Sequence, residues 1–402
     1  MPPQALEGIR VLDVTQLIAG PYATKLLADY GADVIKIERP RIGDVSRRMG
    51  PFVNDEPHPE KSGLFLHLNT NKRGVTLDLK SATGRKIFLG LAKFADVVVE
   101  SFAPGTMDSF GLGYSSLKAI NPRIIVTSVS NYGQTGPYRD YKISEIIAYA
   151  MGGPMHATGL PEREPMKLGG SVIQYQTGAA AATATAMALV AAERNGHGEH
   201  LDVSLFRTQA SSQDRRTSML VGAQYTGENG DRRPPGVTTA NGIRPCADGY
   251  IAIMGASNRF TGVVRMMGQP ELLTDPRFDT VVKRSIPETS EEFDIHYIPF
   301  LMQYTKRELF AMAQKNGLPS GPVFTAEDLC VEPHFRERGF WQETRHPVAG
   351  SLTQTGRPFI LNATPWRHRF AAPVLGQHTG EILADLGYEP RDIARLHSLG
   401  VV

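Results

Sequence analysis

Residues 9–38 read "IRVLDVTQLIAGPYATKLLADYGADVIKIE". Two apolar runs, residues 9–14 and 32–38, flank a segment over 20–31 that has the spacing of an amphipathic helix. Pro21 falls in the first turn of that segment, where a missing N–H costs nothing because first-turn donors have no partner within the helix. The stretch predicts a strand, a helix and a second strand, the repeating unit of a parallel sheet.

The same rhythm recurs further along the chain. Strands are predicted at 74–79, 96–102 and 123–130, and helices at 81–95 and 114–120. This alternation predicts an α/β fold with a Rossmann-like, doubly wound parallel sheet. The turn after the first strand, "TQLIAGPYA", contains no GxGxxG pattern, which disfavours a dinucleotide cofactor such as NAD.

The amino-acid composition of the chain changes near residue 225. Residues 225–245, "YTGENGDRRPPGVTTANGIRP", are rich in Gly, Pro and Asn and predict a linker or active-site loop. A strand at 249–254, helices near 259–268, 290–303 and 305–316, and a final helix at 379–387 follow. We therefore expect three segments: 1–224 as the first part of a large domain, 225–330 as a smaller domain with its linkers, and 331–402 as a return to the large domain.

Composition excludes several classes of protein. The chain has 43 Lys and Arg against 41 Asp and Glu, so no global field attracts nucleic acid or a membrane surface. Cys246 and Cys330 stand in no CxxC spacing, which argues against a zinc site or a disulfide framework. The first residues, "MPPQALEGIR", hold no apolar signal core, and the apolar run 177–192 is broken by threonines. We expect a cytoplasmic protein without a membrane partner.

One further stretch has the features of a functional site. Residues 169–182, "GGSVIQYQTGAAAA", begin with two glycines. They predict a short apolar strand and then an alanine-rich helix that opens with a glycine. Such a turn would present Gln174 or Tyr175 to a cleft. The helix that follows is so rich in alanine and threonine that it must pack at close range against other backbone.

Several pieces of the chain together resemble the family III CoA-transferases, which include carnitine-CoA and formyl-CoA transferase and α-methylacyl-CoA racemase. The pieces run in one order from residue 6 to about 388: "LEGIRVLDVTQLIAGPYATKLLADYGADVIKIERPRIGDVSR", "LNTNKRGVTLDLK", "NPRIIVTSVSNYGQTGPY", "GHGEHLDVSLF", "CADGYIAI", "TDPRF", "LPSGPVFTAEDL" and "HPVAGSLTQTGRPFILNATP".

This resemblance implies an architecture and a reaction. It implies a large domain built from both ends of the chain, a small domain from its middle, and two chains interlocked as a dimer. It also implies that an aspartate attacks an acyl-CoA thioester, forms a mixed anhydride and then an aspartyl-CoA thioester, and passes CoA to an acceptor acid. Covalent catalysis of this kind splits one difficult exchange into easier steps.

The family's aspartate falls on Gln174 when the strand-to-helix turn is aligned on Thr177 and Gly178. A carboxamide cannot form the anhydride. A different alignment would assign the family's aspartate to Asp140 or Asp202, although both residues belong to other recognisable pieces. The histidine that the racemases pair with this aspartate falls on Ser144, beside Glu145, and His156 is the nearest histidine, a residue type that is more often structural.

The positions that bind CoA in the family are also altered. Ala103 and Ser109 occupy places where the family uses arginines to hold phosphates, so we expect weak affinity for coenzyme A. Arg39, Lys72 and Arg73 remain as candidate binding residues, and a solvated basic rim is the alternative explanation for all three.

Three losses on an intact scaffold lead to the functional hypothesis. The chain is similar to a degenerate subunit of a heteromeric CoA-transferase, like that of benzylsuccinate CoA-transferase in anaerobic toluene breakdown, and the resemblance implies no metal and no tightly bound cofactor. A catalytic paralogue would supply the aspartate within a heterodimer or heterotetramer that acts on an acyl-CoA and a carboxylic acid. A self-sufficient homodimer that uses Glu145 or Asp140 is the alternative, and a CoA-independent binding protein is the third.

Overall fold

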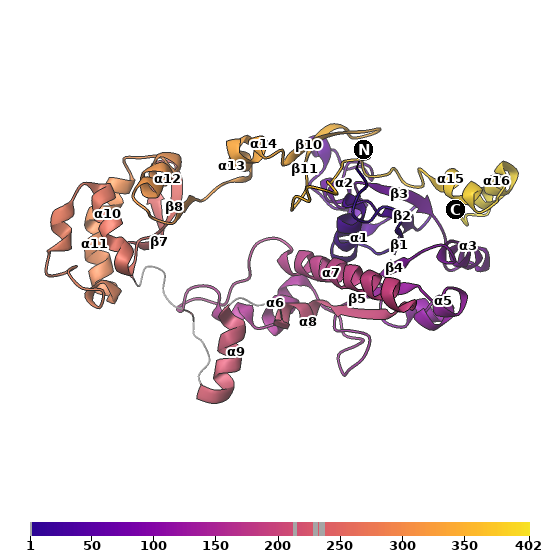
Figure 1. Ribbon diagram of the computed structural model, residues 1–402, viewed down its shortest axis with the longest axis horizontal. Coiled ribbons are helices and arrows are strands. Elements are labelled where there is room, and N and C mark those ends of the chain that lie inside the picture. Colours follow the sequence, from indigo (N-terminus) through magenta and orange to yellow (C-terminus); the bar gives the residue numbers. More distant parts are fainter. Residues whose placement is uncertain (1, 212–214, 228–231, 233–237) are drawn as a thin grey trace. The chain divides into compact units, whose positions relative to one another are not determined.

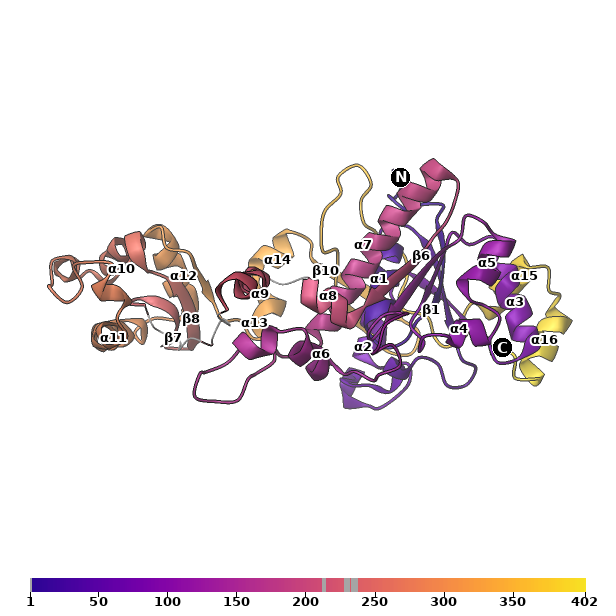
Figure 2. The ribbon, with the colours of Figure 1, turned by 90° about the horizontal axis from the view of Figure 1, so that it is seen from below.

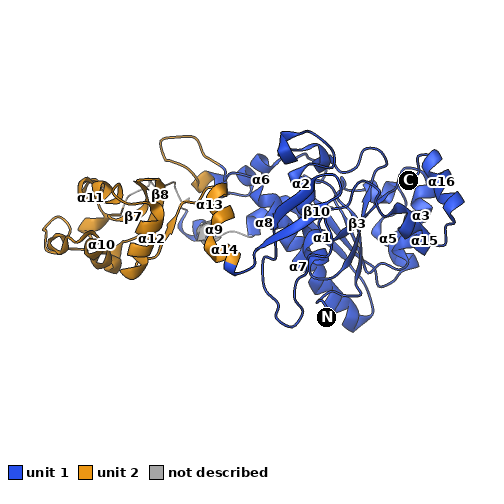
Figure 3. Ribbon diagram, turned by 90° about the horizontal axis from the view of Figure 1, so that it is seen from above, with its two compact units in different colours: residues 1–155, 167–229, 337–402 blue, residues 156–166, 230–336 orange. Residues whose placement is uncertain are grey.

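The structure is a computed structural model, and it describes residues 2–211, 215–227, 232 and 238–402. The chain divides into two compact units (Figure 3). The first consists of residues 1–155, 167–229 and 337–402, and the second consists of residues 156–166 and 230–336. The first unit is therefore assembled from three separate stretches of sequence.

A sheet of six parallel strands forms the centre of the first unit, in the order β3-β2-β1-β4-β5-β6 (Figures 1 and 2). Its strands are β1 (Arg10–Val14), β2 (Asp33–Glu38), β3 (Lys72–Thr76), β4 (Val97–Glu100), β5 (Ile125–Ser130) and β6 (His200–Ser204). The prediction of a Rossmann-like parallel sheet is confirmed. The order of the strands reverses between β1 and β4, which is where open sheets of this kind bind ligands.

Helices cover both faces of this sheet (Figure 2). One face packs against α1 (Ala19–Asp29) and α7 (Val172–Asn195). The other face packs against α3 (Ala82–Ala92), α5 (Tyr114–Ile120), α15 (Thr379–Asp385) and α16 (Pro390–Ser398). Because both faces are buried, the central strands consist mainly of Val and Ile instead of alternating with polar residues. The sequence did not indicate α16.

The remaining elements of the first unit lie in its connections. They are α2 (Gly63–Leu68), α4 (Thr106–Ser109), α6 (Glu145–Met151), α8 (Leu205–Ser211), α9 (Arg215–Thr226) and the antiparallel pair β10 (Trp341–His346) and β11 (Gly350–Thr355).

The outer edge of β3 is closed by residues from the C-terminal stretch. Gly74 donates its N–H to His378 Nδ1 at 3.0 Å and accepts from the His378 N–H at 2.8 Å. Two residues further along the strand, the Thr76 N–H donates to Thr379 Oγ1 at 3.2 Å. An added Cβ at Gly74 would lie 2.9 Å from the Pro373 ring, so the covering segment lies directly against the strand.

The second unit has its own three-stranded antiparallel sheet and hydrophobic core. Its elements are β7 (Asn241–Cys246), β8 (Gly249–Met254), β9 (Ser320–Pro322), α10 (Phe260–Met267), α11 (Pro287–Leu301), α12 (Lys306–Lys315) and α13 (Ala326–Val331), and α14 (Pro333–Glu337) follows. Of the loop predicted at 225–245, residues 228–231 and 233–237 lie outside the described residues, and the strand β7 occupies its last part.

The prediction of a short strand before the alanine-rich helix is wrong. The helix α7 already begins at Val172 and includes Gln174 in its first turn. The carboxylate of Glu145 accepts a hydrogen bond from the Ile173 N–H at 2.8 Å and so satisfies one of the donors that a helix start leaves unpaired. Among the described residues no helix, α7 included, is long and apolar enough to span a bilayer.

Candidate functional site

A cavity of about 380 Å³ opens at the carboxyl ends of β1, β4 and β5. It is named here the Gln174 cavity. Its lining comes from four connections and is made of Gln16, Leu17, Ala19, Gly20, Ser101, Phe102, Ala103, Pro104, Val129, Ser130, Asn131, Arg139, Asp140, Tyr141, Lys142, Gln174 and Leu205. It therefore lies at the point where the strand order reverses, the expected place for a ligand in this fold.

Gln174 is the residue that α7 contributes to this cavity. Its side chain is partly buried, and its amide can both donate and accept hydrogen bonds. An amide carries no charge and gives up no proton at neutral pH. At this position the chain can orient or bind a ligand, but Gln174 offers no nucleophile.

Glu145 stands next to this helix start. Its Oε1 accepts from the Ile173 N–H at 2.8 Å, while the buried Oε2 has no hydrogen-bond partner among the described residues. Ser144, the N-cap of α6, makes no side-chain capping hydrogen bond. Of the two carboxylates considered as substitutes for the family's aspartate, Asp140 lines the cavity and is 77% exposed, whereas Glu145 supports the helix that carries Gln174.

A second cavity, of about 210 Å³, lies beside the first and is named here the Arg39 cavity. It is lined by Val14, Thr15, Gln16, Ile37, Glu38, Arg39, Gly43, Asp44, Leu77, Asp78, Leu79, Lys80, Phe102 and Phe110. Gln16 and Phe102 line both cavities. One elongated ligand can therefore reach from the cationic Arg39 and Lys80 side to Gln174.

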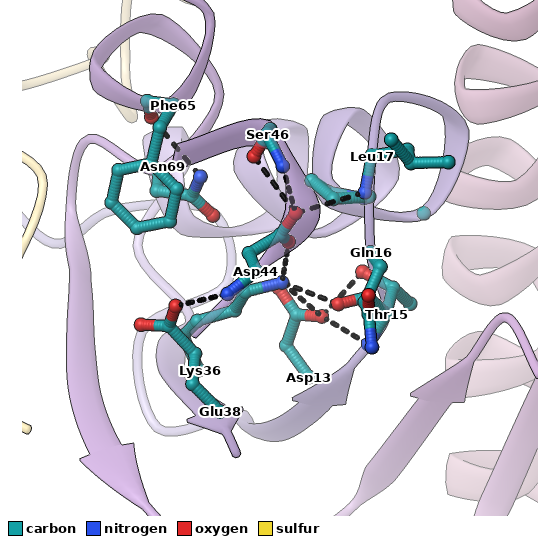
Figure 4. Close-up of polar contacts among 12 residues, drawn as sticks. Asp13, Thr15, Gln16, Leu17, Lys36, Glu38, Asp44, Ser46, Phe65 and Asn69 are labelled. Carbon is teal, nitrogen blue, oxygen red and sulfur yellow. Dashed lines mark hydrogen bonds and ion pairs between the residues drawn. The ribbon is translucent and has the colours of Figure 1, made fainter. Parts of the chain in front are cut away.

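The turn that carries Gln16 rests on a buried network of charges (Figure 4). Leu17 has a φ of 68°, an unfavourable value for a branched side chain, and its N–H donates to Asp44 Oδ1 at 3.1 Å. Asp44 Oδ2 is 2.9 Å from Lys36 Nζ, and the same ammonium donates to the Thr15 carbonyl at 2.5 Å. The network thus fixes the backbone on either side of Gln16.

Asp13 is the anionic centre of this network. It is fully buried, and its Oδ2 lies 3.0 Å from Lys72 Nζ while its Oδ1 lies 3.7 Å from Lys36 Nζ. Burial alone would raise the pKa of Asp13, but the two lysines and the hydroxyls of Thr15 and Thr24 outweigh it and hold the pKa well below its usual range. Burial lowers the pKa of Lys72 to about 8. Charge compensation, not solvent, keeps these groups ionised.

The structure separates the candidate residues for binding CoA. Arg39 lines its cavity, and Ala103 lines the Gln174 cavity. Lys72 is completely buried and donates to Asp13, to the Pro21 carbonyl and to Asn69. Arg73 pairs with Asp33 at 2.6 Å and with Glu381 at 2.7 Å. Neither Lys72 nor Arg73 lines either cavity.

The other candidates also lie away from the two cavities. Ser109 is exposed on α4, and its hydroxyl donates to the Thr106 carbonyl. Asp202 Oδ2 accepts from the Gln134 N–H at 2.9 Å and so holds the loop after β5. His156 is exposed and belongs to the second unit.

Sequence reasoning missed many polar residues of the cavities, among them Gln16, Lys80, Arg139 and Lys142. Gln16 follows β1, Lys80 follows β3, and Arg139 and Lys142 belong to the loop after β5. All four follow the carboxyl end of a predicted strand, and that position was the signal that could have pointed to them. Within the described part of the chain, no group of three or more His, Cys, Asp or Glu side chains could hold a metal ion.

The fold and the two adjacent cavities define an α/β protein with a candidate ligand site at the carboxyl edge of its sheet. The sequence profile of CoA-transferase family III matches residues 6–379. The chain belongs to this family.

Relatives of known activity cover the whole length of the chain. It is 35% identical to the succinyl-CoA–D-citramalate CoA-transferase of Chloroflexus aurantiacus, over 100% of this chain and 99% of that protein. It is 33% identical to the succinyl-CoA:(R)-benzylsuccinate CoA-transferase subunit BbsE of Thauera aromatica, over 99% and 98%. A crystal structure of a CAIB/BAIF family protein from Brucella suis has a TM-score of 0.84 and 30% identity, and the match covers 96% of this chain and 100% of that one.

Proposed function

We propose that this chain is the non-catalytic subunit of a heteromeric family III CoA-transferase. The assembled enzyme would move CoA between an acyl-CoA and a carboxylic acid in the cytoplasm. The observation that carries the proposal is Gln174, a carboxamide in the cavity at the edge of the sheet, on the first turn of α7. A paralogue would provide the aspartate that this chain lacks.

The relatives support a choice of substrates. The name of BbsE describes a subunit of a transferase for succinyl-CoA and benzylsuccinate, and the Chloroflexus relative also uses succinyl-CoA. We propose succinyl-CoA as the donor and an arylsuccinate as the acceptor, which would place the enzyme in aromatic catabolism.

The two cavities suggest how a CoA thioester would lie. A nucleotide in the Arg39 cavity would have Arg39 and Lys80 near its phosphates, because cationic side chains bind phosphate strongly. The pantetheine arm would pass Gln16 and Phe102, which the cavities share, and the thioester would arrive at Gln174. In the assembly, the partner subunit is the alternative binder of this thioester.

A second candidate function has one observation in its favour. Glu145 Oε1 accepts from the N–H of Ile173, the residue before Gln174, and its buried Oε2 has no partner among the described residues, so this carboxylate lies close to the place of the missing aspartate. A homodimer that uses Glu145 for acyl-CoA chemistry would need no paralogue. Glu145 does not line the cavity, and for that reason we rank this function second.

Turnover by the assembled complex tests the proposal. We expect Gln174→Ala to leave kcat within a few-fold, since the covalent work is done elsewhere, and replacement of the partner's aspartate by asparagine to abolish transfer.

Hydroxylamine should trap a thioester on the partner and none on this chain. Gln174→Asp in the isolated chain should not create activity, because Ala103 and Ser109 remain. A trapped adduct on this chain, or a hundredfold loss from Gln174→Ala, would favour the homodimer.

A further inference from the structure

The loop between β5 and α6 is held rigidly at the mouth of the Gln174 cavity. Asn131 Nδ2 donates to the Tyr141 carbonyl at 3.2 Å, and the Gln134 N–H donates to Asp202 at 2.9 Å. The rings of Tyr138 and Tyr141 are stacked with their centroids 5.3 Å apart, and Tyr132 contacts both edge-on. The loop therefore presents its charged residues to the cavity in a preformed arrangement.

Arg139 is the residue of this loop with the most unused binding capacity. Its guanidinium lines the cavity and makes no side-chain hydrogen bond to any described residue. Its one ion pair with a described residue, the neighbouring Asp140, is long at 3.9 Å, and its side chain is 40% exposed. An arginine has five donors in a fixed fork, so this side chain can still accept a planar anion.

The position of Arg139 relates it to the altered sequence nearby. Its Nη2 would lie 3.0 Å from a Cβ added at Gly105, directly beside the loop that carries Ala103. A cation from the β5 loop thus lies beside the segment after β4, and both Arg139 and Ala103 line the cavity. The cavity keeps a positive group although that segment supplies none.

The charges of the cavity favour an anion. Arg139 and Lys142 face one carboxylate, Asp140, so the lining carries one positive charge in excess. Gln174 adds none, whereas an aspartate at that place would cancel the excess and repel an anionic ligand. The apolar side of the lining, formed by Leu17, Pro104 and Leu205, suits a short carbon chain.

We propose that Arg139 binds the free carboxylate of a small dicarboxylic acid, present either as the free acid or as its CoA monothioester, and that the Gln174 cavity holds this ligand without reacting with it. The inference rests on the proposed function only in taking Gln174 to be unreactive. Bidentate pairing of a guanidinium with a carboxylate supplies both the affinity and the choice of ligand.

Calorimetry on the purified chain tests this with matched ligands. Succinyl-CoA and butyryl-CoA have acyl chains of the same length, but butyryl-CoA has a methyl group where succinyl-CoA has its carboxylate. We expect Arg139→Gln to weaken succinyl-CoA binding by about ten- to hundredfold, the range of one charge-assisted hydrogen bond, and to change butyryl-CoA binding less than twofold. Arg139→Lys should recover part of the loss. Succinate alone shows whether the free acid suffices.

Arg194→Gln, exposed at the far end of α7, is the matched control and should change neither affinity. Equal losses for succinyl-CoA and butyryl-CoA would assign Arg139 to the CoA moiety and overturn the proposal, as would no loss at all. A wild-type chain that binds succinyl-CoA no more tightly than butyryl-CoA, or that binds neither, would also overturn it. A covalent adduct trapped on this chain would contradict the proposed function and leave the affinity comparison unaffected.

Discussion

At the scale of single residues, Asp13 decides the electrostatics beneath the site. The buried ammonium of Lys72 pairs with this carboxylate at 3.0 Å, whereas the buried ammonium of Lys36 lies 3.7 Å from it and pairs more closely with Asp44 at 2.9 Å. An isolated buried charge is costly, whereas a compensated one is tolerated. The cluster lies under the turn that bears Gln16, so its loss affects both stability and the shape of the two cavities.

We expect Asp13→Asn to lower the free energy of unfolding by about 3–5 kcal/mol, because it leaves the buried Lys72 ammonium without an ion-pair partner among the described residues. Denaturant titration measures the change. Asp55→Asn, a substitution of an exposed carboxylate, is the control and should stay near the wild-type value. Equal stabilities of the two variants would show that the buried network is not needed for folding.

His67 predicts a dependence of stability on pH. Burial lowers the pKa of His67 from 6.5 to about 4, below its value in the unfolded chain. Between these values the unfolded state binds more protons, so stability is lost as the pH falls from about 6.5 to about 4. The loss reaches at most roughly 3 kcal/mol, from about 1.36 kcal/mol for each pKa unit. His67→Gln should flatten the thermal midpoint against pH in this range, while His156→Gln, at an exposed position, should keep the wild-type slope.

Residue types alone did not disclose which charges are structural. Lys72 and Arg73 stand together in "NTNKRG", and both could be assigned to a phosphate, yet Lys72 is fully buried against Asp13 and Arg73 pairs with Asp33. Burial depends on which strand packs over a residue, and this information is absent from a local motif. Arg39, named from the family resemblance, comes directly after the end of a strand and lines a cavity, and its role in binding stays a prediction.

At the scale of elements, the contact between α1 and α7 sets the position of Gln174. Gly178, one turn further along α7, allows the two helices to approach closely: an added Cβ would lie 2.5 Å from the Ala19 carbonyl oxygen and 3.0 Å from the Tyr22 ring. The expectation that the alanine-rich helix packs against other backbone at close range is confirmed. The start of α7 was mispredicted because its cap, Glu145, is supplied by a different helix.

Gly178→Ala should therefore destabilise the protein by about 1–3 kcal/mol through overpacking, even though alanine favours a helix. Gly222→Ala provides the comparison, because an added Cβ there meets no described atom within 4 Å in α9. That variant should gain about 0.5–1 kcal/mol. Thermal melts of both variants measure these changes. A Gly178→Ala variant that is more stable than the wild-type protein would mean that the helices α1 and α7 can move apart freely.

At the scale of the whole molecule, the first unit leaves apolar surface uncovered along α1 and α7. A groove of about 420 Å³ there is lined by Leu6, Tyr22, Leu26, Leu27, Tyr30, Ala182, Phe359 and their neighbours. Met187, on α7, is 68% exposed. Exposed apolar patches of this kind are typical of interfaces. The alternation of strands and helices was predictable from periodicity, but the order of the strands was not, and an interface depends on a second chain and was implied only by family resemblance.

We expect the chain to be an obligate dimer, with itself or with the proposed paralogue, in which the chains interlock. Interlocked chains cannot separate without unfolding, so sedimentation velocity should show one dimeric species on dilution and a monomer only together with loss of circular dichroism. A stable, folded monomer at low concentration would contradict this architecture.

The edge of β3 stays uncovered during synthesis until the C-terminal stretch that closes it has been made. The residue that pairs with Gly74 is made 304 positions later, which at about 5–20 residues per second leaves the strand waiting for on the order of 15–60 s. Throughout that time an open strand edge is available to neighbouring chains. The growing sheet is therefore exposed to pairing with other chains until its last stretch leaves the ribosome.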